Sequence, residues 1–277
     1  MRNFMNENTL YISDLDGTLL RGNQTVSAYT AEVINSLIEK GMKFTYATAR
    51  SLVTARKVTA NLNIKMPAAV YNGSFVVDTA TGEKLLDGSF ARADAVDILS
   101  ELLAAQIYPI VYSNINGEEK FSYVPHLLSE GASAFRSTRK NDVRDNPVGA
   151  AEELYNGDIF YFTCIDDKAK MQPFFEKWKD RFQCIFYREN YGGEQWLEIL
   201  PKGVNKERAI LALKEITGVD RVVYFGDGAN DVGAFLAADE CYAVENADEN
   251  LKRIACGVID SNENDGVARW LLANYDR

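Results

Sequence analysis

The sequence predicts an α/β protein in which a parallel sheet is interrupted by an inserted domain. Short apolar runs alternate with amphipathic helical segments from Leu10 onwards, and the same alternation returns near Pro201. This pattern is typical of a parallel sheet covered by helices. The intervening residues contain strand-like runs joined by turn sequences, which favour an antiparallel sheet. We therefore expect a Rossmann-like core formed by residues 1–80 and 196–277, and an inserted α+β cap domain formed by residues 81–195.

The first alternation follows from the spacing of apolar residues. Leu10–Ile12 is a short apolar run, and Ala28–Lys40 carries apolar residues at helical spacing before Gly41, a residue typical of the position after a helix. The next strand, helix and strand are expected at Lys43–Ala47, Ser51–Leu62 and Ala68–Tyr71. Strands and helices of this length indicate a parallel sheet with helices on both faces.

Strand-like runs become closely spaced after Asn72-Gly73. Phe75–Val77 and Glu83–Leu86 flank Thr79-Ala80-Thr81-Gly82, and this arrangement predicts a β-hairpin. The polar residues between His126 and Asn146 predict no element. Further strands are expected at Tyr108–Tyr112, Phe121–Val124, Asp158–Cys164, Cys184–Tyr187 and Trp196–Leu200, and helices at Ala93–Ala105 and Ala169–Lys179. This mixture suits an α+β unit.

The alternation resumes with a helix that Asn205 can cap and that runs to Ile216. Strands are then expected at Arg221–Phe225 and Cys241–Val244, and helices at Asn230–Ala237, Asn250–Ala255 and Gly266–Tyr275. The chain thus returns to the same sheet after the insertion.

Charge and hydropathy exclude several classes of partner. Of 277 residues, 40 are acidic and 30 are basic, so the net charge is -10. This charge repels a phosphate backbone, and we expect no nucleic-acid partner. No apolar run approaches the roughly 18 to 20 residues that span a bilayer, and the N-terminal residues lack the apolar stretch of a secretory signal. We therefore expect a cytoplasmic protein with no membrane partner. The sequence leaves open whether it is a monomer or a small homo-oligomer.

The scarcity of histidine restricts the chemistry. His126 is the only histidine in the sequence, which excludes most Ser-His-Asp and Cys-His schemes and all multi-histidine metal sites. The four cysteines show no C-x-x-C spacing and are typical of thiols in a reducing cytosol. An enzyme of this composition must use carboxylates, a lysine and a hard cation.

The strongest chemical signal is Asp14-Leu15-Asp16-Gly17-Thr18, directly after the first expected strand. Sites in open parallel sheets form at the carboxyl ends of strands. Strand alternation would send the carboxylates of Asp14 and Asp16 to the same side. Because two acids this close repel each other, we expect a bound cation.

A second signal, Gly226-Asp227-Gly228-Ala229-Asn230-Asp231, also follows an apolar strand. Asp227 can complete an oxygen-rich cation site with Asp14 and Asp16, and such a site with few protein ligands is typical of Mg²⁺. Asn230 and Asp231 would begin the next helix and orient the ligands.

Two further residues suggest an anion site. Thr48 ends one strand and opens a helix, where a hydroxyl and free N–H groups can bind an anion. Lys206 lies in the first turn of its helix and opposes the helix dipole, so a bound phosphate explains it better than a structural role. Lys202 is the competing candidate for that task.

Taken together, these motifs resemble the haloacid dehalogenase superfamily, in particular its Cof-like phosphatases with a type IIB cap. The motifs occur in the family's order, and the resemblance covers nearly the whole chain. The sequence departs from the family pattern at Ala49 and at Glu207, where glycine is common. The matching segments are Asp14–Thr18, Ala47–Arg50, Gly203–Lys206 and Gly226–Asp231, together with Asn72-Gly73.

The resemblance implies the chemical roles. Asp14 would be the nucleophile that forms an aspartyl-phosphate, and Asp16 would protonate the leaving alkoxide and then activate water. Mg²⁺ would be held by Asp14, the backbone carbonyl of Asp16, and Asp227.

The resemblance also implies the remaining contacts. Thr48, Lys206 and Asn230 would bind the phosphoryl oxygens, and Asp231 would support Lys206 or the metal ligands. The inserted domain would close over the site, contact the leaving group and determine substrate specificity.

The favoured function is hydrolysis of small phosphorylated metabolites, in particular sugar phosphates. A phosphosugar mutase of the same superfamily is an alternative, and free phosphate release would separate the two. A non-catalytic phosphoacceptor signalling module is another alternative, but it has no use for an acid/base at Asp16. A catalytically idle sugar-phosphate sensor is not supported, since all motif residues are present.

One basic cluster has an open interpretation. Arg136, Arg139, Lys140 and Arg144 can recognise a second phosphate or a carboxylate, but a solvated polar loop is favoured.

Overall fold

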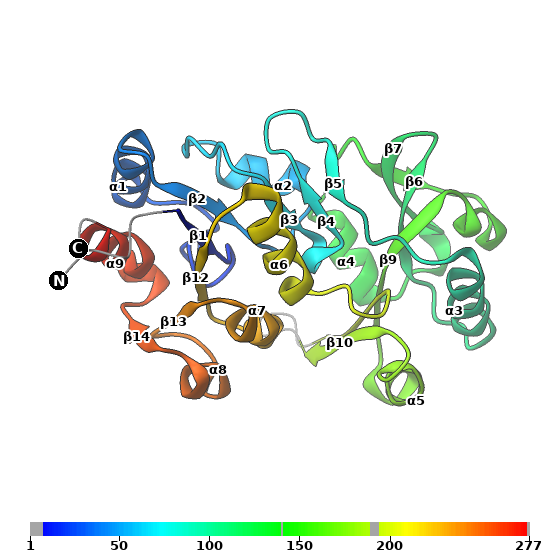
Figure 1. Ribbon diagram of the computed structural model, residues 1–277. Helices are drawn as coiled ribbons and strands as arrows, with labels where there is room; N and C mark the ends of the chain where they lie inside the picture. The colour runs from blue at the N-terminus through cyan, green and yellow to red at the C-terminus, as the bar shows by residue number, and fades with distance from the viewer. Residues whose placement is uncertain (1–7, 140, 189–193, 276–277) are drawn as a thin grey trace. The chain divides into compact units, whose positions relative to one another are not determined.

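The computed structural model describes residues 8–139, 141–188 and 194–275 (Figure 1). They belong to two compact units. The first comprises Met1–Asp87 and Asn205–Arg277, and the second comprises Gly88–Val204. The first contains a parallel sheet and the second a largely antiparallel one, which confirms the α/β class with an inserted α+β segment.

The divisions between the units differ from positions 80/81 and 195/196. They fall after Asp87 and after Val204. Strand β5 (Lys84–Leu86) pairs with β4 (Phe75–Val77) and so stays with the first unit. Strand β11 (Gln195–Leu200) pairs with two strands of the second unit and belongs there. Strand pairing therefore places each division later in the chain than the turn sequences suggest.

The parallel sheet of the first unit runs in the order β14-β13-β12-β1-β2. Every residue of β1 is buried, as expected for a strand with helices on both faces. Ser13 of β1 pairs with Phe225 of β12, so these neighbouring strands end at the same level. The strands are β1 (Thr9–Ser13), β2 (Lys43–Tyr46), β12 (Arg221–Gly226), β13 (Glu240–Val244) and β14 (Gly257–Ile259).

The helices of this unit begin and end largely where capping residues predict. Asn205 caps α6 by accepting the N–H of Arg208 (2.9 Å), and the helix ends at Gly218, which is left-handed (φ 62°). Helix α1 packs against α9, and α6 packs against α7. The helices are α1 (Ala28–Glu39), α2 (Leu52–Val58), α6 (Lys206–Thr217), α7 (Val232–Ala237), α8 (Glu249–Ile254) and α9 (Gly266–Asn274).

Strand β3 (Ala68–Val70) departs from the expected parallel sheet. It meets β2 only through a parallel bridge between Ala47 and Ala69, and otherwise pairs antiparallel with β4. β4 then pairs with β5, which confirms the expected hairpin. The short apolar run at 68–71 shows a strand but not its partner, because pairing depends on the turn that follows.

The sheet of the second unit runs in the order β10-β11-β9-β6-β7-β8. Its neighbouring strands are antiparallel except for the parallel pair β7 and β8. The strands are β6 (Ile110–Ile115), β7 (Glu118–Tyr123), β8 (Asp145–Pro147), β9 (Asp158–Asp166), β10 (Gln183–Arg188) and β11.

Helices cover the two faces of this sheet unequally. α3 (Arg92–Ala104) and α5 (Lys168–Trp178) contribute Leu99 and Trp178 to a core that includes Phe162. Alternation places Ile165 on the opposite face, where it packs with Ala132 of α4 (Glu130–Ser137). Helix α4 and strand β8 lie in the stretch for which the sequence predicts no element, because α4 buries little besides Ala132.

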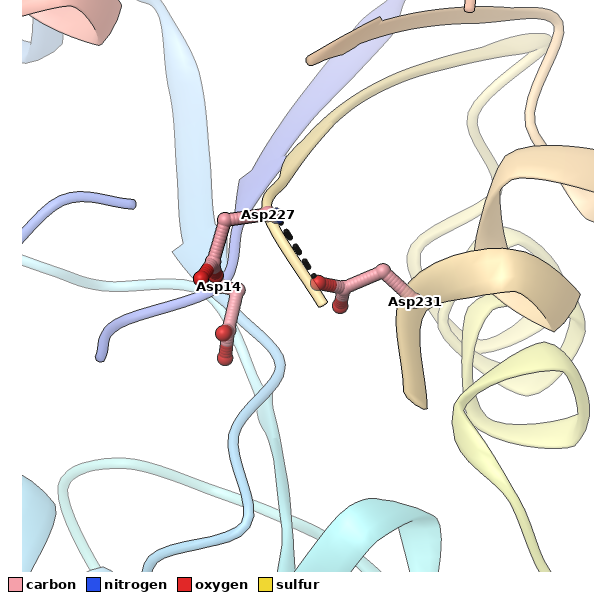
Figure 2. A group of neighbouring side chains, drawn as sticks. All are labelled: Asp14, Asp227 and Asp231. Carbon is pink, nitrogen blue, oxygen red and sulfur yellow. Dashed lines mark hydrogen bonds between the residues drawn. The ribbon is translucent and has the colours of Figure 1, made fainter. Parts of the chain in front are cut away.

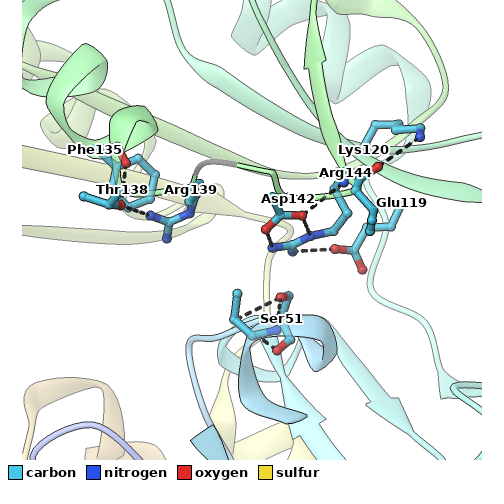
Figure 3. A network of polar contacts seen from close by, with 10 residues as sticks. Ser51, Glu119, Lys120, Phe135, Thr138, Arg139, Asp142 and Arg144 are labelled. Atoms are coloured by element: carbon cyan, nitrogen blue, oxygen red, sulfur yellow. Dashed lines mark hydrogen bonds and ion pairs between the residues drawn. The ribbon is translucent and has the colours of Figure 1, made fainter. Parts of the chain in front are cut away.

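Two arginines of the basic cluster, Arg136 and Arg144, are paired with acids, and Figure 3 shows the pairs of Arg144. Arg144 is only 4% exposed, and its guanidinium donates to both carboxylate oxygens of Asp142 and to Glu119 (2.7–2.9 Å). Arg136 pairs with Asp145 at 3.2 Å. The solvated-loop interpretation is therefore wrong for Arg144, because its charge is buried and paired. Lys140 lies outside the described residues.

Within the described residues, helices long and apolar enough to cross a membrane are absent.

Candidate active site

Two aspartates meet at the carboxyl end of the parallel sheet. Asp14 follows β1, and its backbone N–H donates to the carbonyl of Phe225 (2.9 Å), which extends the pairing of β1 with β12 by one residue. Asp227 follows β12 directly. Since these parallel strands are neighbours in register, the residues after them lie side by side. The sequence motifs 213 residues apart are thereby brought together.

A third carboxylate joins this pair. Among the described residues, Asp14, Asp227 and Asp231 each offer an oxygen, and these oxygens lie within 4.8 Å of one another (Figure 2). Oxygen donors of this kind are the ligands that hard divalent cations prefer. The group therefore fits a magnesium-type ion in its donor chemistry.

Lys206 pairs with two of these three carboxylates. Its Nζ is 2.9 Å from Oδ1 of Asp14 and 2.7 Å from Oδ1 of Asp231, and the lysine side chain is fully buried. The two acids compensate the unfavourable position of a lysine in the first turn of α6. Lys206 therefore has a structural partner as well as a place in the site. Lys202 is an exposed residue of the second unit.

Asp231 is held in place by four donors. Tyr224 donates its hydroxyl to Oδ1 (2.7 Å), next to the Lys206 ammonium. The backbone N–H groups of Asp227 and Gly228 both donate to Oδ2 at 3.0 Å. Asp231 thus fixes the turn that carries Asp227 and also orients Lys206.

Burial and mutual repulsion perturb the acids. Burial, with added repulsion from Asp231 and Asp227, raises the pKa of Asp14 well above its usual range, although Lys206 opposes the shift. Burial and repulsion from Asp231 raise the pKa of Asp227 to about 6. Burial lowers the pKa of Lys206, but Asp14 and Asp231 more than offset this, so its pKa is raised. The lysine stays charged, and the remaining negative charge favours a bound cation.

The turn after β1 requires glycine. Gly17 is left-handed (φ 78°), and a Cβ built on it would lie 2.3 Å from Oδ2 of Asp227. Next to it, Thr18 donates its hydroxyl to Oδ1 of Asp227 (2.8 Å), and Asn246 donates to the carbonyl of Gly17 (2.8 Å). The turn therefore positions the Asp227 carboxylate directly.

The structure separates the two acids of the first motif. The carboxylate of Asp16 stands outside the carboxylate group found in the described residues. It is bound by Arg50 through two hydrogen bonds (2.7 and 2.5 Å), and its side chain is 49% exposed. The strand ends at Ser13, so strand alternation does not carry the side chains of 14 and 16 to one side. The third carboxylate of the group is Asp231 instead.

Thr48 does not open a helix. Its N–H donates to the carbonyl of Ala69 (3.0 Å), and its hydroxyl accepts the N–H of Arg50 (3.1 Å). Helix α2 begins at Leu52, with Ser51 as its N-cap. The side chain of Thr48 is completely buried at the end of β2.

Asn230 makes a contact that the sequence does not reveal. Its Nδ2 donates to Oδ1 of Asn72 at 3.0 Å. Asn72 and Arg50 both lie in segments that match the motifs of the haloacid dehalogenase superfamily. This match is the sequence signal that could have identified them as residues of the site.

Comparison with known proteins identifies the family. A family model described as haloacid dehalogenase-like hydrolase matches residues 11–271. A 5-amino-6-(5-phospho-D-ribitylamino)uracil phosphatase of Bacillus subtilis is 27% identical, over 93% of this chain and 95% of the relative. The crystal structure of TM0651 from Thermotoga maritima has a TM-score of 0.78 at 24% identity, covering 95% and 96% of the two chains. A subclass IIB sugar phosphatase, BT4131, has a TM-score of 0.75 at 17% identity, covering 95% and 97%. The chain therefore belongs to the haloacid dehalogenase-like hydrolase family.

Proposed function

We propose that this protein is a Mg²⁺-dependent phosphatase that hydrolyses small phosphate monoesters through an aspartyl-phosphate on Asp14. The observation that carries the proposal is the buried arrangement of Asp14, Lys206 and Asp231 beside Asp227. The Asp14 carboxylate can attack phosphorus there, because the Lys206 ammonium and a divalent cation next to it would neutralise the charge on the phosphoryl group.

Asp14, Asp227 and the backbone carbonyl of Asp16 would hold the cation. Their oxygen chemistry fits Mg²⁺. Burial and repulsion from Asp231 raise the pKa of Asp227, and a bound cation would offset that repulsion. When bound, the ion supplies electrostatic stabilisation for an anionic nucleophile and an anionic phosphoryl group.

Asp14 acts as the nucleophile, and Asp16 acts as the general acid and then the general base. A carboxylate oxygen of Asp14 forms a bond to phosphorus as the bond to the leaving oxygen breaks, and Asp16 gives that oxygen a proton. A water molecule then attacks the same phosphorus, gives its proton to Asp16, and Asp14 leaves as a carboxylate. Asp16 is bound to Arg50 as a carboxylate, so it would have to release Arg50 and carry a proton before it could protonate the leaving oxygen.

The remaining residues bind the phosphoryl oxygens. An ammonium group has three donors, and Lys206 gives two of them to Asp14 and Asp231, so the third can reach a phosphoryl oxygen. Thr48 and Asn230 would supply neutral donors, and Asp231 would keep Lys206 charged and oriented.

We propose phosphorylated sugars and sugar alcohols as substrates. The support comes from relatives: one Bacillus subtilis protein is named for a phosphoribityl compound, and BT4131 is named a sugar phosphatase. Specificity would reside in the second unit. A cytoplasmic location, a monomer or small homo-oligomer, and the absence of nucleic-acid and membrane partners stay predictions.

The test is phosphate release from a panel of sugar, sugar-alcohol and aryl phosphates with and without Mg²⁺. We expect release that EDTA abolishes and Mg²⁺ restores. Asp14→Asn should lower kcat by on the order of a thousandfold or more, while Lys202→Ala should leave it unchanged. Transfer of phosphate between hexose hydroxyls without release would favour a mutase. A stoichiometric, long-lived phosphoprotein without turnover would favour a phosphoacceptor module.

A further inference from the structure

The turn Tyr71–Gly73 has an unusual backbone. Tyr71 and Asn72 both have a φ of 52°, and Gly73 follows with a φ of 93°. Successive left-handed residues other than glycine are uncommon, and such conformations persist only where the surroundings determine them. All three residues are buried. The contacts of this turn therefore indicate its role.

Its backbone is fixed to the segment after β2. The N–H of Tyr71 donates to the carbonyl of Arg50, and the N–H of Asn72 donates to the carbonyl of Thr48, both at 2.9 Å. The turn is thereby held to the segment that contains the proposed phosphate ligand Thr48.

Its glycine lies against the start of α6. A Cβ built on Gly73 would lie 2.1 Å from the carbonyl oxygen of Asn205 and 2.6 Å from its carbonyl carbon. Asn205 is the N-cap residue directly before Lys206. The same turn therefore also contacts the residue next to the site lysine.

The side chain of Asn72 reaches the fourth motif. It is 3% exposed, and its Oδ1 accepts a hydrogen bond from Nδ2 of Asn230 at 3.0 Å. On the other side, Oδ1 of Asn230 lies close to Gly228, where a Cβ would be 2.9 Å away. The Asn230 amide thus has a neighbour at each of its two polar atoms. An amide nitrogen carries two N–H donors, so Asn230 can give one to Asn72 and one to a ligand.

We propose that Asn72 is a positioning residue that orients the Asn230 amide so that its second N–H is presented to the phosphoryl group. This rests on the proposed phosphatase function. The left-handed turn keeps Asn72 in place because it is hydrogen-bonded to the segment of Thr48 and lies closely against the start of α6.

A double-mutant cycle tests this role. Asn72→Gly removes the amide but keeps a residue that accepts the left-handed backbone. It should lower kcat/KM for p-nitrophenyl phosphate by about tenfold, as should Asn230→Ala, because misplaced binding groups cost on this order or more. The double variant should be no slower than Asn230→Ala alone. Binding of inorganic phosphate in the presence of Mg²⁺, measured by calorimetry, should weaken with the same non-additivity. This readout needs no turnover.

A purely structural role for Asn72 predicts a different result. The loss caused by Asn72→Gly would then persist undiminished in the Asn230→Ala background, and this would overturn the proposal. Asn72→Asp is the second variant, should Asn72→Gly fail to fold, since aspartate tolerates the left-handed region and keeps the acceptor oxygen. In the Asn72→Asp background, Asn230→Ala should lower kcat/KM by the same factor as in the wild type. A smaller factor would contradict the positioning role of Asn72.

The outcome is separable from that of the proposed function. If the wild-type protein releases no phosphate from any ester, the phosphatase proposal fails. If it is active and the two substitutions act independently, only the role of Asn72 fails.

Discussion

Nζ of Lys206 lies 2.9 Å from Oδ1 of Asp14 and 2.7 Å from Oδ1 of Asp231, and all three side chains are buried. The lysine thus connects the proposed nucleophile to the residue that orders the Asp227 turn. Removing one partner from such a buried ion pair leaves uncompensated charge, which is far more costly than losing an exposed pair.

Lys206→Ala should therefore damage stability and activity together. We expect the free energy of unfolding in the metal-free protein to fall by about 3–5 kcal/mol, measured by urea denaturation. Phosphate release should become too slow to follow. Lys202→Ala is the matched control, since Lys202 is exposed. Equal, small effects of both substitutions would contradict the ion-pair account.

Gly17→Ala should weaken metal binding through Asp227. The added Cβ would lie 2.3 Å from Oδ2 of Asp227, so the carboxylate must move. Gly203→Ala is a control for backbone strain, because Gly203 has a similar φ (76°) and no described atom within 4 Å of its would-be Cβ. Both variants should lose stability, but calorimetry should show weaker Mg²⁺ binding only for Gly17→Ala. A parallel loss in Gly203→Ala would assign the effect to strain.

Asp16→Asn should separate substrates by their leaving groups. An alkoxide leaving from a sugar phosphate needs a proton, whereas p-nitrophenolate does not, so formation of the phosphoenzyme should slow by about 10²–10⁴-fold only for the sugar phosphate. Rapid-quench kinetics should also show that phosphoenzyme accumulates from the aryl ester, since water activation is lost too. Equal slowing of the first step for both esters would argue against an acid role for Asp16.

The metal-free protein should show a pH dependence to which Asp227 contributes a separate component. Its pKa is raised from 3.8 to about 6 because the carboxyl is buried next to Asp231. The folded state then binds the proton more tightly than the unfolded chain, so this group's contribution to stability is fully present below pH 3.8 and is lost as the pH rises through about 6. Because a proton competes with the metal, Mg²⁺ affinity should increase over the same range.

Denaturation and Mg²⁺ titration at a series of pH values measure both trends. Asp227→Asn is the control, and its stability should lack this component. A Mg²⁺ affinity independent of pH between 4 and 7 would show that Asp227 is not titrating at the site.

The sequence predicted the core of the fold because its elements carry strong local patterns. The apolar runs of β1 and β12 and the capped helix after Asn205 lie where expected. Helix α4 was not predicted, because its only buried residue is Ala132. The partner of β3 was not predictable either, since a parallel and an antiparallel strand have the same short apolar run.

The site was predictable at the level of motifs but not of contacts. Strand order brings Asp14 and Asp227 together, as parallel-sheet geometry requires. The binding of Asp16 by Arg50 and of Asn230 by Asn72 depends on side chains from distant segments. Spacing within one sequence does not encode such pairs, so neither contact was foreseen.

The most direct test of the central claim is the identity of the residue that carries the phosphoryl group. Wild-type protein mixed with p-nitrophenyl phosphate and Mg²⁺ is quenched in acid within the first turnover, and its peptides are analysed by mass spectrometry. We predict one added phosphoryl group on the peptide containing Asp14, and none in Asp14→Asn. Phosphorylation of a different residue, or undiminished phosphate release by Asp14→Asn, would contradict the account.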